Sequence, residues 1–364
     1  MRSANSFEAD RAAAIHHLRE RGVSNFWDLC RLARGTDPIF VANELGHLPA
    51  AGETQLGLRE AGPDESPGRA EWYFTDETSK EVAGLLPGKL LCLGVPTLAT
   101  ARETGVLLVD DSPWLTERFD FHHNEWDRSD ISEVSIGDEF DSAILDPPWY
   151  GDNLHDWLQF ASGHVRAGGV IAVPLMGENT RPSASQDRDR IMSAASQMGA
   201  LELRREIVRY EVPAFERYAF VNAGFGSVEP WRLADLLLVR NELPTQQPRR
   251  PVGESDWFDF RLGRQIISIR KTAASNTAPS STPFVSPVVG YDDYLLKSVS
   301  RRDPKLQNAT FWTSRSTVGE VRDCARFTHF LRRCSEASLG TRGLDSHEVE
   351  LASRIGIELV LEES

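Results

Sequence analysis

The chain lacks the sequence features that mark membrane, secreted, disulfide-rich and zinc-binding proteins. None of its apolar runs is long enough to cross a membrane, and residues 1–19 are too polar for a secretory signal. Its four scattered cysteines form no Cys-x-x-Cys pair, which argues against a disulfide framework or a zinc ribbon. The adjacent histidines His16-His17 and His122-His123 point different ways in any helix or strand. We expect a cytoplasmic protein with reduced thiols and no metal site.

Positive charge is also scarce, and it is unevenly distributed. The net charge of −14 argues against a general nucleic-acid coat. Residues 1–245 hold 23 Lys and Arg against 39 Asp and Glu, whereas residues 246–345 hold 16 against 10. The basic segment is a candidate docking surface for a polyanion or an acidic partner. A solvated basic face is the other interpretation.

The composition is that of an ordinary globular protein, with 40% hydrophobic and 26% charged residues among 364. Shifts in pattern predict four consecutive regions. These are a helical N-terminal region over 1–60, an α/β domain over 61–245, a connector with a strand and a disordered linker over 246–285, and a small basic domain over 286–364. The first and last regions are candidate surfaces for a protein partner.

Local signals predict the ends of several helices. Ser24-Asn25 can cap a second N-terminal helix, and Asp37-Pro38 can open a third. Thr75 can cap a helix before the first strand, and Asp345 with Glu348 looks like a capping box. Residues 51–70 are rich in Gly, Pro, Ala and Glu, which predicts a linker or exposed loop.

Apolar runs alternate with helical stretches through the middle of the chain. Strands that alternate with helices predict a mostly parallel, doubly wound Rossmann-like sheet, and the last two runs predict a terminal antiparallel hairpin. The predicted strands are 89–94, 105–109, 119–121, 140–145, 170–173, 201–210 and 217–222.

The fourth of these strands ends at Asp146-Pro147-Pro148-Trp149. The strand must end there because two prolines cannot donate ladder hydrogen bonds. Ligands bind beyond the carboxyl ends of strands in an open α/β sheet. An acid, a rigid turn and a large aromatic ring at this place therefore predict a functional site. A strand-ending turn with a buried Trp is the alternative.

These residue types suit methylation of an amino nitrogen. A planar amine is a poor nucleophile, and acceptors for its two hydrogens favour the pyramidal form that attacks a methyl group. The carboxylate of Asp146 and the carbonyl of Pro147 are two such acceptors. Trp149 offers a flat face on which a base can stack. Such a site would act by positioning and electrostatics.

The turns after the first two strands bear on the cofactor. Asp110 or Asp111 closes the second strand, where an acid commonly binds a ribose diol, although a turn acid is the other interpretation. The first turn has only Gly94, so the Gly-x-Gly-x-x-Gly cradle for a pyrophosphate is missing. This weighs against NAD or FAD and leaves a smaller nucleoside cofactor such as S-adenosylmethionine.

Five short motifs over about residues 71–225 together resemble a known family. Their ordered set is similar to the probable N6-adenine methyltransferase family, whose eukaryotic members include lysine methyltransferases of translation elongation factor 1A. The motifs are Trp72 to Thr78, Cys92 to Leu98, Asp120-Phe121, Asp146 to Trp149, and Phe215-Glu216-Arg217-Tyr218. The family commonly carries Phe or Tyr where Trp149 stands, and Asp-Pro-Pro-Trp is closer to adenine methyltransferases acting on RNA and DNA.

The resemblance implies an S-adenosylmethionine fold and a set of site residues. The implied catalytic residues are Asp146, Pro147, Pro148 and Trp149. The implied cofactor-binding residues are Gly94, Pro96, Thr97, Asp110, Asp111 and Asp146. The implied substrate-binding residues are Trp149, Tyr150, Glu216 and Arg217, although a structural ion pair is the alternative for Glu216 and Arg217.

We therefore expect an S-adenosylmethionine-dependent N-methyltransferase, with the N6 amine of adenine in nucleic acid as the favoured acceptor. A protein lysine methyltransferase with the same site is the first alternative. A catalytically inactive scaffold that holds partners is the second, because the regions outside 71–225 match no family.

The C-terminal third adds three expectations. Residues 257–269 alternate enough to form one strand, and residues 272–283 have the composition of a disordered linker. Aromatic residues beyond this point are interleaved with basic ones, which suits single-stranded nucleic acid and equally the core of a small domain. These residues are Tyr291, Tyr294, Phe311 and Trp312, among Arg301, Arg302, Lys305 and Arg315.

Overall fold

The protein is described from a computed structural model, in which the chain divides into two compact units. The first combines Met1–His47, Tyr73–Glu211 and Glu229–Glu254, and the second combines Leu48–Trp72, Val212–Val228 and Ser255–Ser364. Each unit thus joins segments that are distant in the sequence, where four consecutive regions are expected. The structure describes residues 4–49, 62–69, 71–121, 123–137, 139–147, 153–245, 256–279, 281–296, 308–338, 343–357 and 359.

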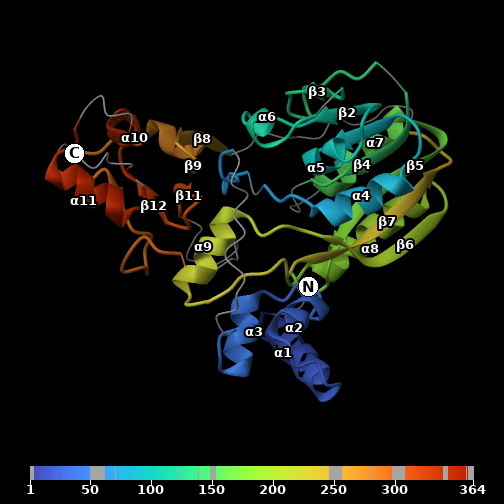
Figure 1. Cartoon of the computed structure of the whole chain (residues 1–364), viewed down its shortest axis with the longest axis horizontal. Helices are drawn as coiled ribbons and strands as arrows, with labels where there is room; N and C mark the ends of the chain where they lie inside the picture. The colour runs from blue at the N-terminus through green and yellow to red at the C-terminus, as the bar shows by residue number, and fades with distance from the viewer. Residues whose placement is uncertain are drawn as a thin grey trace. The chain divides into compact units, whose positions relative to one another are not determined.

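The first unit is a seven-stranded sheet with helices on both faces (Figure 1). Its helices are α1 (Ala4–Glu20), α2 (Phe26–Leu32), α3 (Pro38–Leu45), α4 (Asp76–Leu85), α5 (Pro96–Thr100), α6 (Leu115–Arg118), α7 (Asn153–His164) and α8 (Ala184–Ser196). Its strands are β1 (Leu90–Leu93), β2 (Val106–Val109), β3 (Glu125–Asp127), β4 (Phe140–Leu145), β5 (Val165–Met176), β6 (Leu201–Arg209) and β7 (Leu233–Asn241).

The strand order is β3-β2-β1-β4-β5-β7-β6. The first five strands in this order pair in parallel, and β7 runs antiparallel to both β5 and β6. The predicted fold class is confirmed: the sheet is mostly parallel and Rossmann-like, and its terminal strands β7 and β6 pair antiparallel.

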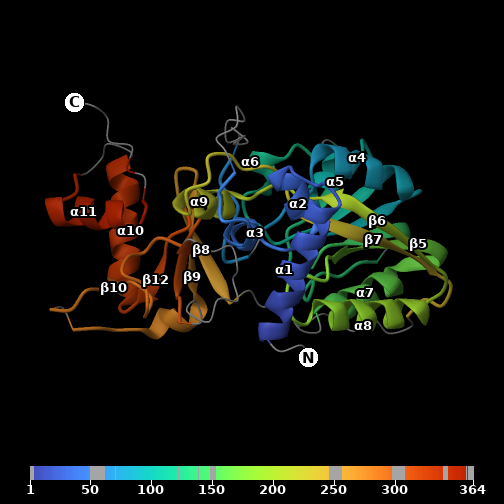
Figure 2. The same ribbon diagram turned by 90° about the horizontal axis from the view of Figure 1, so that it is seen from below.

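Alternate side chains of the central strands β1 and β4 lie in the main hydrophobic core. Leu91 and Leu93 of β1 lie in register with Ala143 and Leu145 of β4. All four cluster with buried residues of α7 and α8, including Leu158. Figure 2 shows α7 and α8 on one side of the sheet and α4 and α5 on the other. Both faces of β1 and β4 are therefore covered, which explains why these strands are almost wholly apolar.

The prediction of the second strand of the hairpin is wrong. The segment predicted as strand 217–222 lies in α9 (Ala214–Asn222), and the last strand of the sheet is β7. Phe215, Ala219 and Phe220 are buried, at the spacing of one helix face, although the local alternation also suits a strand. β7 lies between β5 and β6, so it is mostly buried and apolar, and its polar residues are Asp235, Arg240 and Asn241.

The predicted third strand is also misplaced. The strand at that edge of the sheet is β3, and Phe119 and Phe121 precede it as buried residues outside any strand. The Phe119 ring meets Tyr73 edge-on at 5.0 Å between centroids. Aromatic packing, rather than strand pairing, thus accounts for this short apolar run.

The N-terminal helices belong to the first unit. The predicted caps are confirmed, since Asn25 accepts from the Asp28 N–H and Asp37 from the Ile39 and Phe40 N–H groups. Arg34, between α2 and α3, pairs with Asp235 of β7 at 3.1 Å. Asp235 is 2% exposed and also pairs with Arg188 of α8 at 2.6 Å. A charged side chain in this sheet is thus compensated by two guanidinium groups, as burial requires.

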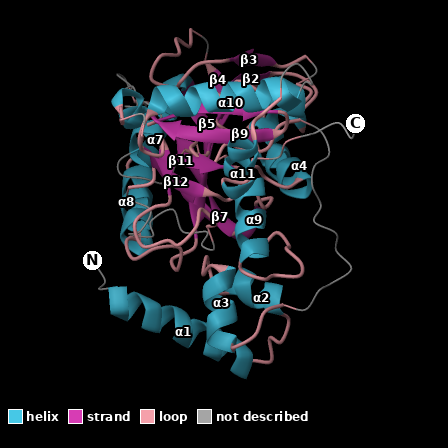
Figure 3. Cartoon of the chain, turned by 90° about the vertical axis from the view of Figure 1, so that its left-hand side faces the viewer, coloured by secondary structure: helices cyan, strands magenta, loops and turns pink. Residues whose placement is uncertain are grey.

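The second unit contains a five-stranded antiparallel sheet of order β10-β12-β11-β9-β8. Helix α10 packs on it through Phe327, Phe330 and Leu331 (Figure 3). The elements are α9, β8 (Trp257–Leu262), β9 (Gln265–Arg270), the 3₁₀ helix η1 (Lys271–Ser275), β10 (Val285–Ser286), β11 (Phe311–Thr313), β12 (Val318–Val321), α10 (Cys324–Ser338) and α11 (Ser346–Arg354).

Several C-terminal predictions are corrected or confirmed by this unit. The strand predicted over 257–269 is the hairpin β8–β9, which turns at Gly263 with φ of +54°. The 3₁₀ helix η1 begins the segment predicted as a disordered linker. The capping box of α11 is confirmed, since the Asp345 side chain and Glu348 bond each other's backbone N–H groups.

The segment 62–69 is not the exposed linker that its composition predicts. Asp64, Glu65 and Ser66 are buried in the second unit. Asp64 accepts a hydrogen bond from the Ser314 hydroxyl at 2.8 Å, and Glu65 accepts one from the Ala214 N–H at 2.7 Å. Because these partners lie far away in the sequence, composition alone could not reveal that the segment is buried. The remaining positions of this linker lie mostly outside the described residues.

Candidate active site

The first unit has one topological switch point, between β1 and β4. From β1 the chain passes outward to β2 and β3, then returns to pair β4 with the other side of β1. Leu93 and Leu145, the last residues of these strands, lie opposite each other. Gly94 and Asp146 therefore leave the sheet side by side. Ligands of open α/β sheets bind in the crevice at such a point.

Gly94 is adapted to this position by its backbone. Its φ of +68° is one that residues with side chains rarely adopt. A Cβ atom here would lie 3.4 Å from the Trp157 ring of α7 and 3.5 Å from the Asp146 carbonyl oxygen. The Gly94 N–H donates to Val109 at 3.0 Å, and the Asp146 N–H donates to Leu93 at 3.1 Å. The two turns are thus anchored to the sheet.

Pro96 and Thr97 open α5 directly after this turn. Both side chains are buried, and Thr97 is 2% exposed. Among the described residues, the Thr97 hydroxyl has no hydrogen-bond partner. A buried hydroxyl without a partner is costly. The residues fit a cofactor with a polar group here, because such a group would satisfy Thr97.

Asp110 and Asp111 follow β2, the next strand along the same edge. The Asp110 carboxylate accepts the Ser112 N–H at 2.9 Å, and its carbonyl accepts the Trp126 indole N–H at 3.1 Å. These bonds hold Asp110 in a fixed turn beyond the strand. Both carboxylates are half-buried, which leaves each with solvent-accessible surface at this edge.

Asp146 has a neighbour that the sequence analysis does not assign to the site. Tyr210 follows β6, and its buried hydroxyl is near enough to Asp146 to respond to the charge of that side chain. Burial, followed by the charge of Asp146, raises the pKa of Tyr210 well above its usual value, while the charge of Arg232 lowers it. The only sequence signal is that a tyrosine ends a strand whose carboxyl end shares the edge with Asp146.

The backbone of Tyr210 is fixed from two sides. Its N–H donates to the Arg232 carbonyl at 3.1 Å, and it forms a bridge with Phe74. The Phe74 and Tyr210 rings meet edge-on at 5.2 Å between centroids. Phe74 directly precedes Thr75, which caps α4 by accepting the Thr78 N–H, as predicted. The motif around Trp72 to Thr78 thus supports the residue that lies near Asp146.

Comparisons with known proteins were made for the whole chain. No family model matches it, and no curated protein matches it. Solved structures do match, at low sequence identity. One is the branched-chain polyamine synthase from Thermus thermophilus, in complex with N4-aminopropylspermidine and 5'-methylthioadenosine. It is 17% identical, covers 68% of this chain and 91% of that chain, and has a TM-score of 0.49.

Methyltransferases recur among the other matching structures. A 16S rRNA methyltransferase from Thermus thermophilus, solved with AdoMet and guanosine, is 13% identical over 58% of this chain and 52% of that chain, with a TM-score of 0.32. An N-methyltransferase from Bradyrhizobium japonicum, solved with S-adenosyl-L-homocysteine, is 14% identical over 49% and 89%, with a TM-score of 0.29. The reaction of this chain does not follow from such distant similarity.

The structure describes only some of the remaining predicted site residues. Pro147 is buried directly after Asp146, whereas Pro148, Trp149 and Tyr150 lie outside the described residues. Glu216 and Arg217 lie on α9 of the second unit, where the neighbouring Phe215 packs edge-on against Trp72 and Trp312. Their role in substrate binding stays a prediction.

The aromatic residues of the C-terminal third form a core. Tyr294, Phe311 and Trp312 are all buried, and Phe311 packs against Phe327 at 5.2 Å between centroids. Buried rings cannot stack with bases, so these three do not form an exposed nucleic-acid platform. Arg301, Arg302 and Lys305 lie outside the described residues.

The described residues lack two further features. No group of three or more His, Cys, Asp or Glu side chains there is placed to hold a metal ion. No helix in the same residues has the length and apolar character needed to cross a membrane. All four cysteines are free and buried, and burial raises the pKa of Cys334 to about 12.

Proposed function

We propose that this protein is an S-adenosylmethionine-dependent N-methyltransferase whose transfer site is the crevice between β1 and β4. The observation that carries the proposal is the adjacency of Gly94 and Asp146 at the switch point, with their strands in register. A cofactor-type turn and an acceptor-type acid thus share one crevice.

The cofactor would be held by Gly94, Pro96, Thr97, Asp110 and Asp111. S-adenosylmethionine supplies an electrophilic methyl group when bound. Gly94 allows close approach because it has no side chain, and the buried Thr97 hydroxyl can bond a polar group. Asp110, fixed beyond β2, suits a ribose diol.

The acceptor nitrogen would be oriented by Asp146 and Pro147. The carboxylate and the carbonyl accept the two N–H groups of the amine, which directs its lone pair toward the methyl group. Tyr210 places a polar hydroxyl within the electrostatic reach of that carboxylate. Pro148, Trp149 and Tyr150 complete the site in this proposal. Positioning of this kind accounts for large rate effects in enzymes.

The chemical class of the acceptor is narrowed by charge. Residues 103–156, which include Asp146, hold fifteen Asp or Glu and two Lys or Arg, a net charge of −13. This segment runs from the turn before β2 into α7, entirely in the first unit. Such a field attracts cations and repels polyanions. It favours an aliphatic amine, such as a lysine side chain or a polyamine, which would arrive as an ammonium ion and lose one proton to water before its lone pair attacks the methyl group.

The amino group of adenine is the second candidate acceptor. The Asp146-Pro147-Pro148-Trp149 motif supports it, because Trp149 could stack on a base. A catalytically inactive scaffold is a third possibility, supported by the large regions outside the motifs. These candidates differ in whether they bind cofactor and in which polymer they modify.

The experiment is transfer of a labelled methyl group from S-adenosylmethionine into cell extract, separated into nucleic-acid, protein and small-molecule fractions. Asp146→Asn, which keeps the shape of the side chain and removes its charge, should abolish incorporation. Glu133→Gln, an exposed acid of the same segment, should leave it unchanged. Binding of S-adenosylhomocysteine is measured in parallel by calorimetry.

Each outcome separates the candidates. Label in protein or polyamines supports the aliphatic acceptor, and label in nucleic acid supports adenine. If S-adenosylhomocysteine binds but no label is incorporated, the proposed acceptor class is wrong and the proposed cofactor site stands. Failure of S-adenosylhomocysteine to bind would contradict the methyltransferase proposal and favour the inactive scaffold.

A further inference from the structure

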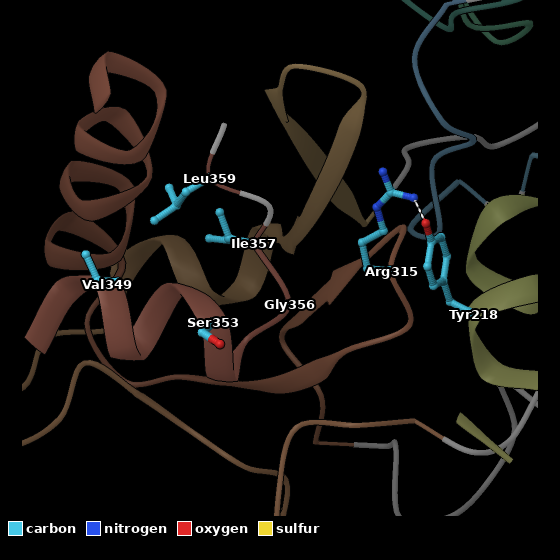
Figure 4. Close-up of a pocket in the computed structure, with 7 residues that line it drawn as sticks. All are labelled: Tyr218, Arg315, Val349, Ser353, Gly356, Ile357 and Leu359. Carbon is cyan, nitrogen blue, oxygen red and sulfur yellow. Dashed lines mark hydrogen bonds between the residues drawn. The ribbon is translucent and has the colours of Figure 1, made fainter. Parts of the chain in front are cut away.

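The second unit contains a cavity that the proposed methyl transfer does not use. Its volume is about 420 Å³, within the range of small-molecule sites. The walls come from α9, the turn between β11 and β12, α11 and the residues that follow α11. The side chains that define its character are Tyr218, Arg315, Val349, Ser353, Ile357 and Leu359 (Figure 4).

The two ends of this cavity differ in chemistry. Figure 4 shows Arg315 and Tyr218 together at one side, with Val349, Ile357 and Leu359 at the other. Ile357 is buried, whereas Val349 and Leu359 are half-buried. One end therefore carries a guanidinium that is ion-paired with the buried Asp64, and the other end is aliphatic.

Arg315 is held in place before any ligand arrives. Its side chain is 11% exposed, and it donates a hydrogen bond to the Tyr218 hydroxyl. Its guanidinium carbon lies 4.5 Å from the centre of the Tyr218 ring. Arg315 also forms an ion pair with the buried Asp64 carboxylate, which lies 3.7 Å from Nε and itself accepts a hydrogen bond from Ser314. A fixed guanidinium loses little freedom on binding, which favours affinity.

The wall after α11 is also preformed. Gly356 has a φ of +67°, and a Cβ there would lie 2.8 Å from Thr317 Cγ2. Gln265 donates to the Gly356 carbonyl at 2.7 Å, and Thr317 donates to the Ile355 carbonyl at 2.7 Å. The chain end is thus tied to the sheet, so the hollow does not depend on a ligand to form.

We propose that this cavity binds a small carboxylate with an aliphatic tail. The planar guanidinium matches a carboxylate in geometry and charge. The aliphatic end would take the tail and release water from apolar surface. Ser353, exposed on α11, marks the side from which a ligand enters. The inference is independent of the methyl-transfer site, because every residue involved belongs to the second unit.

The test is calorimetric titration of the full chain with octanoate, 1-octanol and octylammonium. Octanoate should bind, octanol should bind at least about tenfold more weakly, and octylammonium should not bind. Arg315→Gln should lower the affinity for octanoate by about tenfold to a hundredfold. Arg322→Gln is the matched control, since Arg322 is an exposed arginine paired with Glu320 on the same sheet. It should bind octanoate like the parent protein.

A second pair of variants covers the case in which Arg315→Gln does not fold. Ser353→Phe fills the cavity from an exposed helix position and should abolish octanoate binding. Glu350→Phe adds the same ring elsewhere on exposed α11 and should bind normally. Equal affinity for octanoate and octanol, or full binding by folded Ser353→Phe, would overturn the proposal, as would failure of octanoate to bind at all.

Discussion

The charge of the Asp146 carboxylate acts on the Tyr210 hydroxyl, although the two residues follow strands that are three places apart in the sheet. Asp146 follows β4 and Tyr210 follows β6, with β5 and β7 between those strands. Because the pKa of Tyr210 is raised, its hydroxyl stays protonated and can donate. The carboxylate that would orient the acceptor amine thus has a protonated hydroxyl within its electrostatic reach.

Removal of this hydroxyl should slow methyl transfer without weakening cofactor binding. We expect Tyr210→Phe to lower the rate at saturating substrates by about tenfold, because the Asp146 carboxylate loses the polar group beside it. Affinity for S-adenosylhomocysteine should stay within about twofold. Initial rates and calorimetry measure the two quantities. Tyr294→Phe, a buried tyrosine of the second unit, is the control and should alter neither. A parallel loss of rate and cofactor affinity would mean that Tyr210 acts only through folding.

Gly94→Ala should weaken cofactor binding beyond its effect on stability. The φ of +68° makes the substitution cost about 1 kcal/mol or more, and the new methyl group would enter the crevice near Asp146. Gly105→Ala is a matched control, because Gly105 has a φ of +79° and open space around it. Both variants should lose similar stability in urea. Only Gly94→Ala should lose about tenfold in affinity for S-adenosylhomocysteine. Equal affinities of the two variants would contradict the assignment of Gly94 to the cofactor site.

Stability of the first unit should depend on the charge of Asp141 at low pH. Its carboxylate accepts from Arg166 Nε at 2.6 Å and from the Lys89 N–H at 2.8 Å. The hydrogen bond from Arg166, followed by that from Lys89, holds the pKa of Asp141 below its usual value of 3.8. A depressed pKa stabilises the fold above the unfolded pKa, and this stabilisation is lost as the pH falls through the folded pKa.

Asp141→Asn should therefore reduce the free energy of unfolding near neutral pH, and the difference from the parent should shrink below about pH 4. Urea denaturation at several pH values measures this difference. Asp189→Asn, on the exposed face of α8, serves as control and should show no such convergence. A difference that stays constant down to the acid limit would show that the Asp141 charge is not the cause.

Predictions from local sequence succeeded where the determinants are close in the chain. Asn25, Asp37, Thr75 and Asp345 cap helices because each side chain bonds an N–H two or three residues later. The Asp146 turn follows from the two prolines that end β4. The placing of Asp146 beyond a parallel strand was thus available from the sequence.

Predictions failed where a short alternation of apolar and polar residues fits both a strand and another structure. Residues 217–222 alternate like a strand, yet they form part of α9, whose buried residues follow a helical spacing. Residues 119–121 resemble a strand, yet Phe119 and Phe121 are occupied by packing against other rings. In both segments the pattern is too short to distinguish periods of 2 and 3.6 residues.

The sequence by itself determined the class of the sheet, the helix caps and the position of Asp146, because strand periodicity, capping and proline chemistry act within a few residues. The tertiary structure alone decided that β7 lies between β5 and β6, that Tyr210 lies near Asp146, and that Asp64 is buried beside Arg315. These outcomes depend on contacts between residues tens to hundreds of positions apart. Burial of polar groups is stable only when such distant partners meet.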